Sequence, residues 1–366
     1  MELQVADTSK PSNPLHRATA VRRFLERIAE TFAKKSFKPY PLFTGGHAQT
    51  LAAYFWPRRY RLETDRDGER IFEIEAQVKV LAHCRWQKNP SEHSTIVLWH
   101  GFEGSTASIY MLAMAHKAFH AGFNVVRVNY RNCGGTEHLT PTLYHGGMSG
   151  DLRAVINELI QKDGMNSIFA IGFSLGGNMV LKLAGEYGEN PPEQVVAICA
   201  VSPSADLRAS TDFLLRRQNW IYQQDFLRRL KKRIRVKHKL YPNLYDLSSL
   251  AFIRTIRDFD EEFTSVSHGF VNADDYYYRS SAVRVIEHIR LPTLIIHSED
   301  DPFIPFKPLQ DAAVASNPYI LLLKTERGGH VAFISATKNG EDRFWAENRA
   351  IEFCMLAREY DDVRSS

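Results

Sequence analysis

The sequence has few cysteines, no long apolar run and only a weak excess of charge of one sign. Its four cysteines are far apart among 366 residues and include no C-x-x-C pair, which argues against a disulfide framework or a zinc site. The first 24 residues lack the apolar core of a signal peptide, and no later run is long enough to span a bilayer. A formal net charge of +4 gives no reason to expect nucleic acid as a partner. We therefore expect a soluble cytoplasmic protein.

Short apolar runs alternate with helical patterns through much of the chain. Two early strands are expected within residues 69–86, and the later strand-like runs are largely apolar, as in strands buried on both faces. Such alternation predicts an α/β protein with a mostly parallel sheet and helices on both faces. The later strands are expected at 94–101, 124–131, 167–174, 195–203, 291–297 and 319–325.

The alternation stops after Pro203 and resumes near residue 291, which suggests four parts of the chain. A polar tail and an amphipathic helix occupy residues 1–36, and a first part of the core spans 37–204. A helical, charged and aromatic insertion spans 205–281, and the second part of the core spans 282–366. The helix of the first part has an apolar face formed by Val21, Phe24, Leu25, Ile28 and Phe32.

One serine lies between glycines where an apolar run meets a helical pattern. The segment Gly172-Phe-Ser174-Leu-Gly176 has the G-x-S-x-G spacing of a nucleophile elbow. The turn is sharp, so the residues two positions either side of the nucleophile must lack bulk. The alternative is a glycine-rich turn whose serine only caps the helix. The position between this strand and this helix favours Ser174 as a catalytic nucleophile.

A catalytic serine needs a base that is oriented by an acid, and in such folds the chain order is serine, acid, histidine. His330 follows the last expected strand and two glycines, whereas most of the 14 histidines have no such position. We expect His330 as the general base. Asp301 is expected as its acid because it lies three residues after the small Ser298, with adjacent Asp300 as the competing candidate.

An oxyanion hole needs two backbone N–H donors near the nucleophile. Leu175, directly after Ser174, is expected to supply one. The loop after the strand 94–101 reads His100-Gly-Phe-Glu-Gly104, and Phe102 is expected to supply the other. Glycines on both sides of Phe102 allow the backbone to approach a substrate.

These segments together resemble the α/β-hydrolase superfamily, in the branch that includes YheT and EMB8 and related lipases of animals. The resemblance implies an α/β-hydrolase fold with a helical lid formed by the insertion, and a serine hydrolase of carboxylic esters, in some relatives acylglycerols or phospholipids. It also implies the triad Ser174, Asp301 and His330. We expect no cofactor. The matching segments are "GGHAQTL" (45–51), "HGFEGS" (100–105), "NYRNCGGTE" (129–137), "YHGGMSGDL" (144–152), "GFSLGGN" (172–178), "DDPFIP" (300–305) and "GGH" (328–330).

Several polar residues in these segments have structural interpretations. His47 is expected to be a hydrogen-bonded structural histidine near the entrance of the site. Arg131 and Asn132 are expected to brace the nucleophile loop or to satisfy backbone groups, and Cys133 to be a buried inert thiol. No metal is expected, because metal-ligand spacing is absent from the remaining candidates, Glu137, His138 and Asp151.

The insertion is expected to influence the choice of substrate, a small-molecule ester or lipid. Trp220 and Phe226 are candidates for lining an acyl pocket, although docking of the lid on the core explains such residues equally well. The basic run 228–239 suggests a peripheral membrane contact, with a solvated helix face as the favoured alternative.

Two other functions fit the same residues. An acyltransferase would use the same triad with an alcohol or thiol in place of water. A non-catalytic binding protein on this fold is disfavoured by the complete set of serine, acid and histidine.

Overall fold

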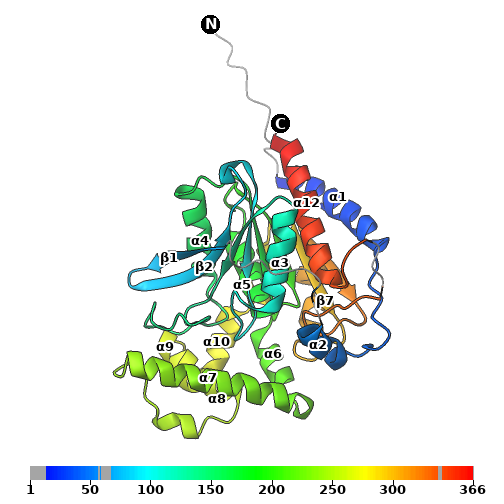
Figure 1. Cartoon of the computed structure of the whole chain (residues 1–366). Helices are drawn as coiled ribbons and strands as arrows, with labels where there is room; N and C mark the ends of the chain where they lie inside the picture. Colours follow the sequence, from blue (N-terminus) through cyan, green and yellow to red (C-terminus); the bar gives the residue numbers. More distant parts are fainter. Residues whose placement is uncertain (1–13, 57, 59–66, 337–339, 366) are drawn as a thin grey trace.

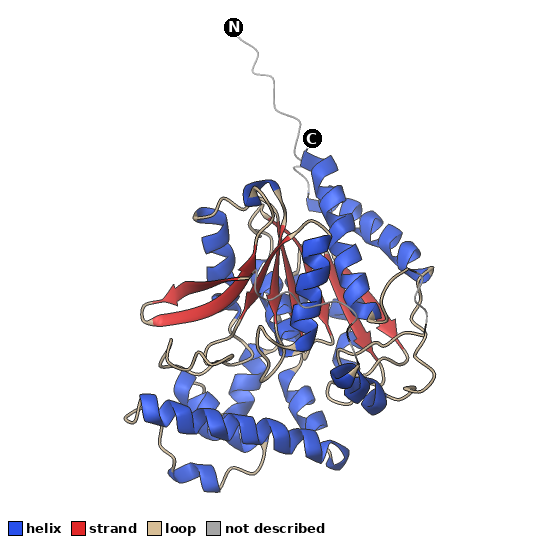
Figure 2. Ribbon diagram, viewed as in Figure 1, coloured by secondary structure: helices blue, strands red, loops and turns tan. Residues whose placement is uncertain are grey.

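The strands of the protein form one mixed sheet with helices on both faces (Figures 1 and 2). The computed structural model describes residues 14–56, 58, 67–336 and 340–365. The polar tail expected at the start of the chain lies largely outside these residues. The strands are β1 (Gly68–Glu75), β2 (Val78–Arg85), β3 (Thr95–Trp99), β4 (Asn124–Val128), β5 (Ile168–Phe173), β6 (Val195–Val201), β7 (Thr293–Ser298) and β8 (Ile320–Thr325).

The strand order in the sheet is β1-β2-β4-β3-β5-β6-β7-β8. β2 is antiparallel to both of its neighbours, and the pairs from β4 to β8 are all parallel. The carboxyl ends of β3 to β8 therefore meet at one edge of the sheet, where ligands bind in open α/β folds. This arrangement confirms the fold class expected from the sequence.

Helices cover the two faces in separate groups. In Figure 1, α3 (Ile109–His120) and α12 (Trp345–Ser365) lie in front of the sheet, and α1 (Pro14–Ala33) packs beside α12. On the other face, α4 (Ser149–Gln161) packs against α5 (Leu175–Tyr187). The five apolar residues expected on the face of α1 are all buried, which confirms that pattern.

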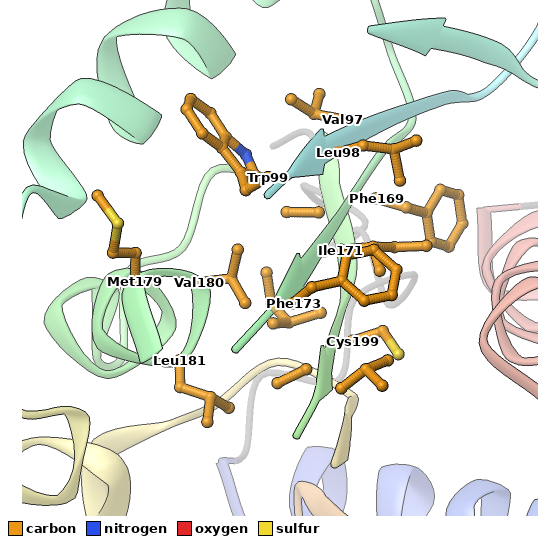
Figure 3. Packing of buried hydrophobic residues seen from close by; sticks show 14 of the residues in the cluster. Val97, Leu98, Trp99, Phe169, Ile171, Phe173, Met179, Val180, Leu181 and Cys199 are labelled. Atoms are coloured by element: carbon orange, nitrogen blue, oxygen red, sulfur yellow. The ribbon is translucent and has the colours of Figure 1, made fainter. Parts of the chain in front are cut away.

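The core surrounds β3, β5 and β6, whose residues are buried at every position. Figure 3 shows Trp99 on β3, Phe169 and Phe173 on β5 and Met179 on α5 in this cluster. Because the strands are covered on both faces, their sequences are continuous apolar runs without alternation. β5 lies in the middle of the sheet, so the residue after it is held by a rigid support.

Residues 205–281, all of which the structure describes, contain helices and no strand. They lie together below the sheet in Figure 1, and their longest helix, α7, crosses the lower part of the molecule. Leu227, Leu230 and Ile234 of α7 form a second, smaller core with Phe259 and Phe263. The helices are α6 (Leu207–Leu214), α7 (Trp220–Leu240), α8 (Ile256–Phe259), α9 (Val266–His268) and α10 (Ala273–Ser280), with a π-helical turn at Asp260–Ser265 between α8 and α9.

No helix is expected from the sequence between α1 and β1. The structure nevertheless has α2 (Gly46–Phe55) there, in a segment whose sequence has no clear apolar period. The remaining short helix, α11 (Ala312–Ala315), precedes β8. The described ranges contain no helix with the length and apolar character that crossing a membrane requires.

Candidate active site

Ser174 occupies a strained turn between β5 and α5. Its backbone has φ 53° and ψ −115°, a conformation that residues with a side chain rarely adopt. The Ser174 N–H donates to the Val201 carbonyl at 2.9 Å, and its carbonyl accepts from the N–H groups of Asn178 and Ser204 at 3.1 and 3.2 Å. These bonds hold the serine at the carboxyl edge of the sheet.

The two glycines around Ser174 are required by close backbone contacts. A Cβ atom on Gly172 would lie 2.1 Å from the Gly176 carbonyl oxygen. A Cβ atom on Gly176 would lie 2.6 Å from the carbonyl oxygens of Trp99 and His100 at the end of β3. The G-x-S-x-G spacing therefore reflects the packing of α5 against two neighbouring strands, as the sequence suggests.

The structure brings His330 against Asp301. His330 Nδ1 lies 2.7 Å from Asp301 Oδ2, and the other oxygen, Oδ1, accepts from the N–H groups of Phe303 and Ile304 at 2.8 and 3.0 Å. Burial alone would raise the pKa of Asp301, but the nearby His330 and these hydrogen bonds outweigh it and lower the pKa. Asp301 is therefore an ionised hydrogen-bond acceptor for the imidazole.

Asp300 points to a different part of the same loop. Its Oδ1 accepts from the Gly329 N–H at 2.9 Å, so it contacts the backbone before His330 and not the ring. Burial raises the pKa of Asp300, in contrast to its neighbour. Adjacent side chains at the end of a strand point in different directions, which accounts for the separation of the two carboxyl groups.

Helix α2 supports the loop that contains His330. The His330 N–H donates to Thr50 Oγ1 at 2.9 Å, and the fully buried Gln49 exchanges hydrogen bonds with the backbone of Ile334. His47 at the start of α2 lies 3.3 Å from the Tyr222 hydroxyl on α7. Sequence reasoning identified the 45–51 segment but missed the roles of Thr50 and Gln49, whose partners lie about 280 positions away in the chain.

In the loop after β3, the N–H groups on both sides of Phe102 have hydrogen-bond partners. The Gly101 N–H donates to the Tyr110 hydroxyl at 2.8 Å, and the Glu103 N–H donates to the Tyr144 hydroxyl at 3.1 Å. Within the part of the chain that the structure describes, the Phe102 N–H has no hydrogen-bond partner. Leu175, the second expected donor, is the first residue of α5, where N–H groups have no partner within the helix.

Ser174, His330, Phe102 and Leu175 all line one cavity of about 320 Å³. Phe226 of α7 also lines it and packs against Phe102, with the ring centroids 5.3 Å apart. The rest of the lining is mostly apolar and includes residues of α2, α6 and α10: Thr50, Ala53, Tyr54, Leu207, Leu214, Tyr276 and Tyr277.

Trp220 is not brought to this cavity. It is the first residue of α7, its side chain is 60% exposed, and the cavity lining does not include it. A helix presents residues 220 and 226 on different faces, so only Phe226 points inward. Trp220 is therefore not retained as a substrate-contacting residue.

An acidic residue that sequence reasoning did not identify lies in the cavity wall. Asp260 begins the π-helical turn, and its carboxyl oxygens accept from the hydroxyl groups of Thr264 and Tyr277, each at 2.8 Å. Burial raises its pKa to about 6, although these hydrogen bonds act in the opposite direction. Short π-helical turns are frequent at functional sites, but no sequence pattern predicted this one.

The other polar residues of the matching segments have structural partners. Arg131 forms a buried two-pronged ion pair with Asp151, and Asn132 donates to the Thr142 carbonyl at 2.6 Å. All four cysteines are buried, and burial raises the pKa of Cys133 to about 12, which leaves its thiol unreactive. Among the described residues, no group of three or more His, Cys, Asp or Glu side chains has the arrangement of a metal site.

Asn178 is a further residue whose role the sequence did not reveal. Its side-chain amide donates to the carbonyl groups of Gly146 and Ser280 at 2.8 and 2.9 Å, and its oxygen accepts from the Ala282 N–H at 2.8 Å. The residue thus connects α5 to the end of the helical segment 205–281. The only indication of this role in the sequence was its position four residues after Ser174.

The chain is similar in sequence to known proteins over most of its length. Residues 94–337 match the family described as alpha/beta hydrolase fold. The chain is 32% identical over 332 residues to YheT of Escherichia coli (strain K12), whose name marks it provisionally as an esterase; the match covers 87% of this chain and 93% of YheT. It is 30% identical over 270 residues to the monoacylglycerol lipase of Saccharomyces cerevisiae (strain ATCC 204508 / S288c), covering 71% of this chain and 59% of that protein.

A solved structure shows the same fold at low sequence identity. The Pyrococcus furiosus esterase Pf2001 aligns with a TM-score of 0.52 and 16% identity, over 80% of this chain and 92% of that one. The family match spans most of the chain, and YheT is matched over nearly its whole length. The chain therefore belongs to the α/β-hydrolase family, in the branch that includes YheT.

Proposed function

We propose that this α/β hydrolase cleaves carboxylic esters through an acyl-enzyme formed on Ser174, with His330 as general base and Asp301 as its orienting acid. The main observation is that Ser174 and His330 line one cavity while Asp301 binds the far side of the imidazole. The names of relatives, which include a monoacylglycerol lipase, support ester hydrolysis as the reaction class.

The hydrogen bond to Asp301 defines the tautomer of the base. A carboxylate can only accept, so His330 Nδ1 donates and Nε2 has the lone pair. Nε2 takes the hydroxyl proton as Ser174 Oγ attacks the ester carbonyl carbon. The tetrahedral intermediate then releases the alcohol, which receives that proton, and leaves an acyl group on the serine. Water repeats the sequence, releasing the acid and free enzyme.

The oxyanion of the intermediate needs two donors that exist before the reaction begins. The Phe102 N–H is suited to this task because its neighbours in the loop already have partners. The Leu175 N–H lies at the positive end of the α5 dipole, where negative charge is stabilised.

The cavity supports an apolar acyl group as the part of the substrate that is buried. Its volume of about 320 Å³ suits a small or medium-sized chain, and its walls include side chains of the insertion. We assign the insertion 205–281 the role of a lid over Ser174, between the two parts of the core at 37–204 and 282–366.

A fluorophosphonate probe and a series of p-nitrophenyl esters test this proposal. Wild-type protein should be labelled by the probe and should hydrolyse the esters, and Ser174→Ala should lose both properties because the attacking oxygen is removed. Ser204→Ala, which changes another serine of the cavity wall, is the matched control and should be labelled normally. Labelling of Ser174→Ala would refute the assignment, and ester synthesis with added alcohol would reveal acyl transfer.

A further inference from the structure

Large apolar side chains remain exposed beside the entrance of the cavity. Leu51, Tyr54 and Phe55 of α2 are exposed by 49%, 69% and 76%. At the start of α7, Trp220 and Ile221 are exposed by 60% and 73%. We call these five residues the rim. Contiguous exposed apolar surface of this kind marks an interaction site, whereas single exposed apolar residues do not.

The two halves of the rim are adjacent. His47 of α2 stacks on Tyr222 of α7, with ring centroids 5.7 Å apart, and Figure 1 shows α2 beside the first turns of α7. Tyr54 also lines the cavity together with Thr50 and Ala53. The rim therefore borders the opening through which a substrate enters.

A stripe of positive charge follows the rim along α7. Arg228, Lys232, Arg235 and Lys239 are exposed and are spaced by four, three and four residues, which places them on one face of the helix. Asp225, which pairs with Arg228, is the only acidic residue of α7. The outward face of the helix thus has a strong excess of positive charge.

We propose that the rim and this basic stripe dock the protein on an anionic lipid surface, with the cavity opening facing the lipid. Tyrosine and tryptophan suit the boundary between acyl chains and headgroups, and basic side chains near such a surface are attracted to its anionic lipids. A second copy of the chain fits less well, because symmetric pairing through the rim would bring two basic stripes together. The delivery of lipid esters to Ser174 rests on the function proposed above, but docking itself does not.

Sedimentation with vesicles tests the docking surface on the full chain. Wild-type protein should bind vesicles of phosphatidylglycerol and phosphatidylcholine in a ratio of about 3:7. The triple variant L51S/F55S/I221S should bind at least about tenfold more weakly, because each substitution removes an apolar contact. The control I71S/V363S changes exposed apolar residues of β1 and α12 and should bind as the wild type does.

The charge contribution is measured separately. R228E/K232E/R235E should lose the preference for phosphatidylglycerol over pure phosphatidylcholine, and binding of the wild type should weaken as salt is raised. Thermal melts should show that all variants fold, since every substituted residue is exposed.

Three results would overturn the proposal: no binding of the wild type to these vesicles, equal binding by the rim variant, or a dimer that the rim variant converts to a monomer in light scattering. Hydrolysis of dissolved p-nitrophenyl butyrate is the independent readout of the active site. The rim variant should retain it, and Ser174→Ala should lose it while still binding vesicles. Failure of docking and failure of the proposed catalysis are therefore distinguishable.

Discussion

At the scale of single residues, Asp300 and Asp301 have adjacent positions but different surroundings. Asp301 binds the His330 ring, whereas Asp300 binds the backbone at Gly329. We expect Asp301→Asn to reduce turnover by about four orders of magnitude, because an amide no longer holds the imidazole in its active tautomer. Asp300→Asn should retain most activity, since its oxygen can still accept from Gly329. Steady-state kinetics on dissolved esters measures both effects.

The two variants serve as controls for each other. Thermal melts should show that both are folded, so that the loss in Asp301→Asn is a loss of chemistry. If Asp300→Asn were the folded but inactive protein, the orienting acid would be Asp300.

Asp260 gives a prediction about pH. Its pKa is about 6 in the folded protein and 3.8 ordinarily, so between these values the folded state holds a proton that the unfolded chain has released. Stability should therefore fall as pH rises through this range. The asparagine side chain of Asp260→Asn does not titrate, so this variant lacks the effect. Between pH 4.5 and 7.5, the unfolding free energy of the wild type should fall by about 2 kcal/mol more than that of the variant. Urea unfolding at the two pH values measures this, and an unchanged difference would refute it.

Some of the site residues could be predicted from the sequence because their roles depend on the residues next to them in the chain. The elbow at Ser174 is visible since glycines two positions either side are required by the packing of β5 and α5. His330 could be predicted as the base because it directly follows the last strand and its loop. The contacts of Thr50 and Asp260 depend on how distant segments approach one another, and no local pattern reports that.

At the scale of elements, α7 contributes one residue to the cavity and presents others to solvent. Phe226 packs on Phe102 in the cavity wall, so Phe226→Ala should enlarge the acyl site. The ratio of kcat/KM for p-nitrophenyl decanoate over butyrate should rise about tenfold, since such pocket contacts are worth about 1–3 kcal/mol. Trp220→Ala, at an exposed position outside the cavity, is the matched control and should leave the ratio unchanged. A normal ratio in Phe226→Ala would mean that this side chain only docks the insertion.

The helices and strands differed in how clearly the sequence predicted them. Buried strands such as β5 are continuous apolar runs with abrupt ends, and α1 has a regular apolar stripe. Helix α2 lacks that stripe because its exposed side is apolar as well, where Leu51 and Phe55 face outward. In α7 the long basic run conceals which face of the first turn points inward, so Trp220 and Phe226 could not be separated.

At the scale of the whole molecule, Asn178 joins the core to the insertion. Asn178→Ala would leave the carbonyls of Gly146 and Ser280 and the N–H of Ala282 without their partner. We expect a loss of about 3 kcal/mol in unfolding free energy, with faster proteolytic cleavage within 205–281. Asn190→Ala, at an exposed asparagine after α5, should melt as the wild type does. Cleavage of the Asn178 variant at the wild-type rate would argue against this attachment.

The overall architecture was accessible from the order of the elements. Alternating strands and helices specify a parallel sheet, and residues 205–281, which interrupt the alternation, contain helices and no strand. The packing partners of that segment were not accessible from the residue pattern, and only the family resemblance implied a lid, because its position depends on contacts such as those of Asn178, which only the folded chain brings together.

The burial of the four cysteines has a practical consequence. All of them have thiols that burial keeps protonated, as the raised pKa values of Cys84 and Cys133 illustrate. Maleimide reagents should therefore leave the native chain unmodified. A cysteine introduced at the exposed Arg235 would then take up a spin label or fluorophore alone, and the protein would need no cysteine-free background for spectroscopy of α7.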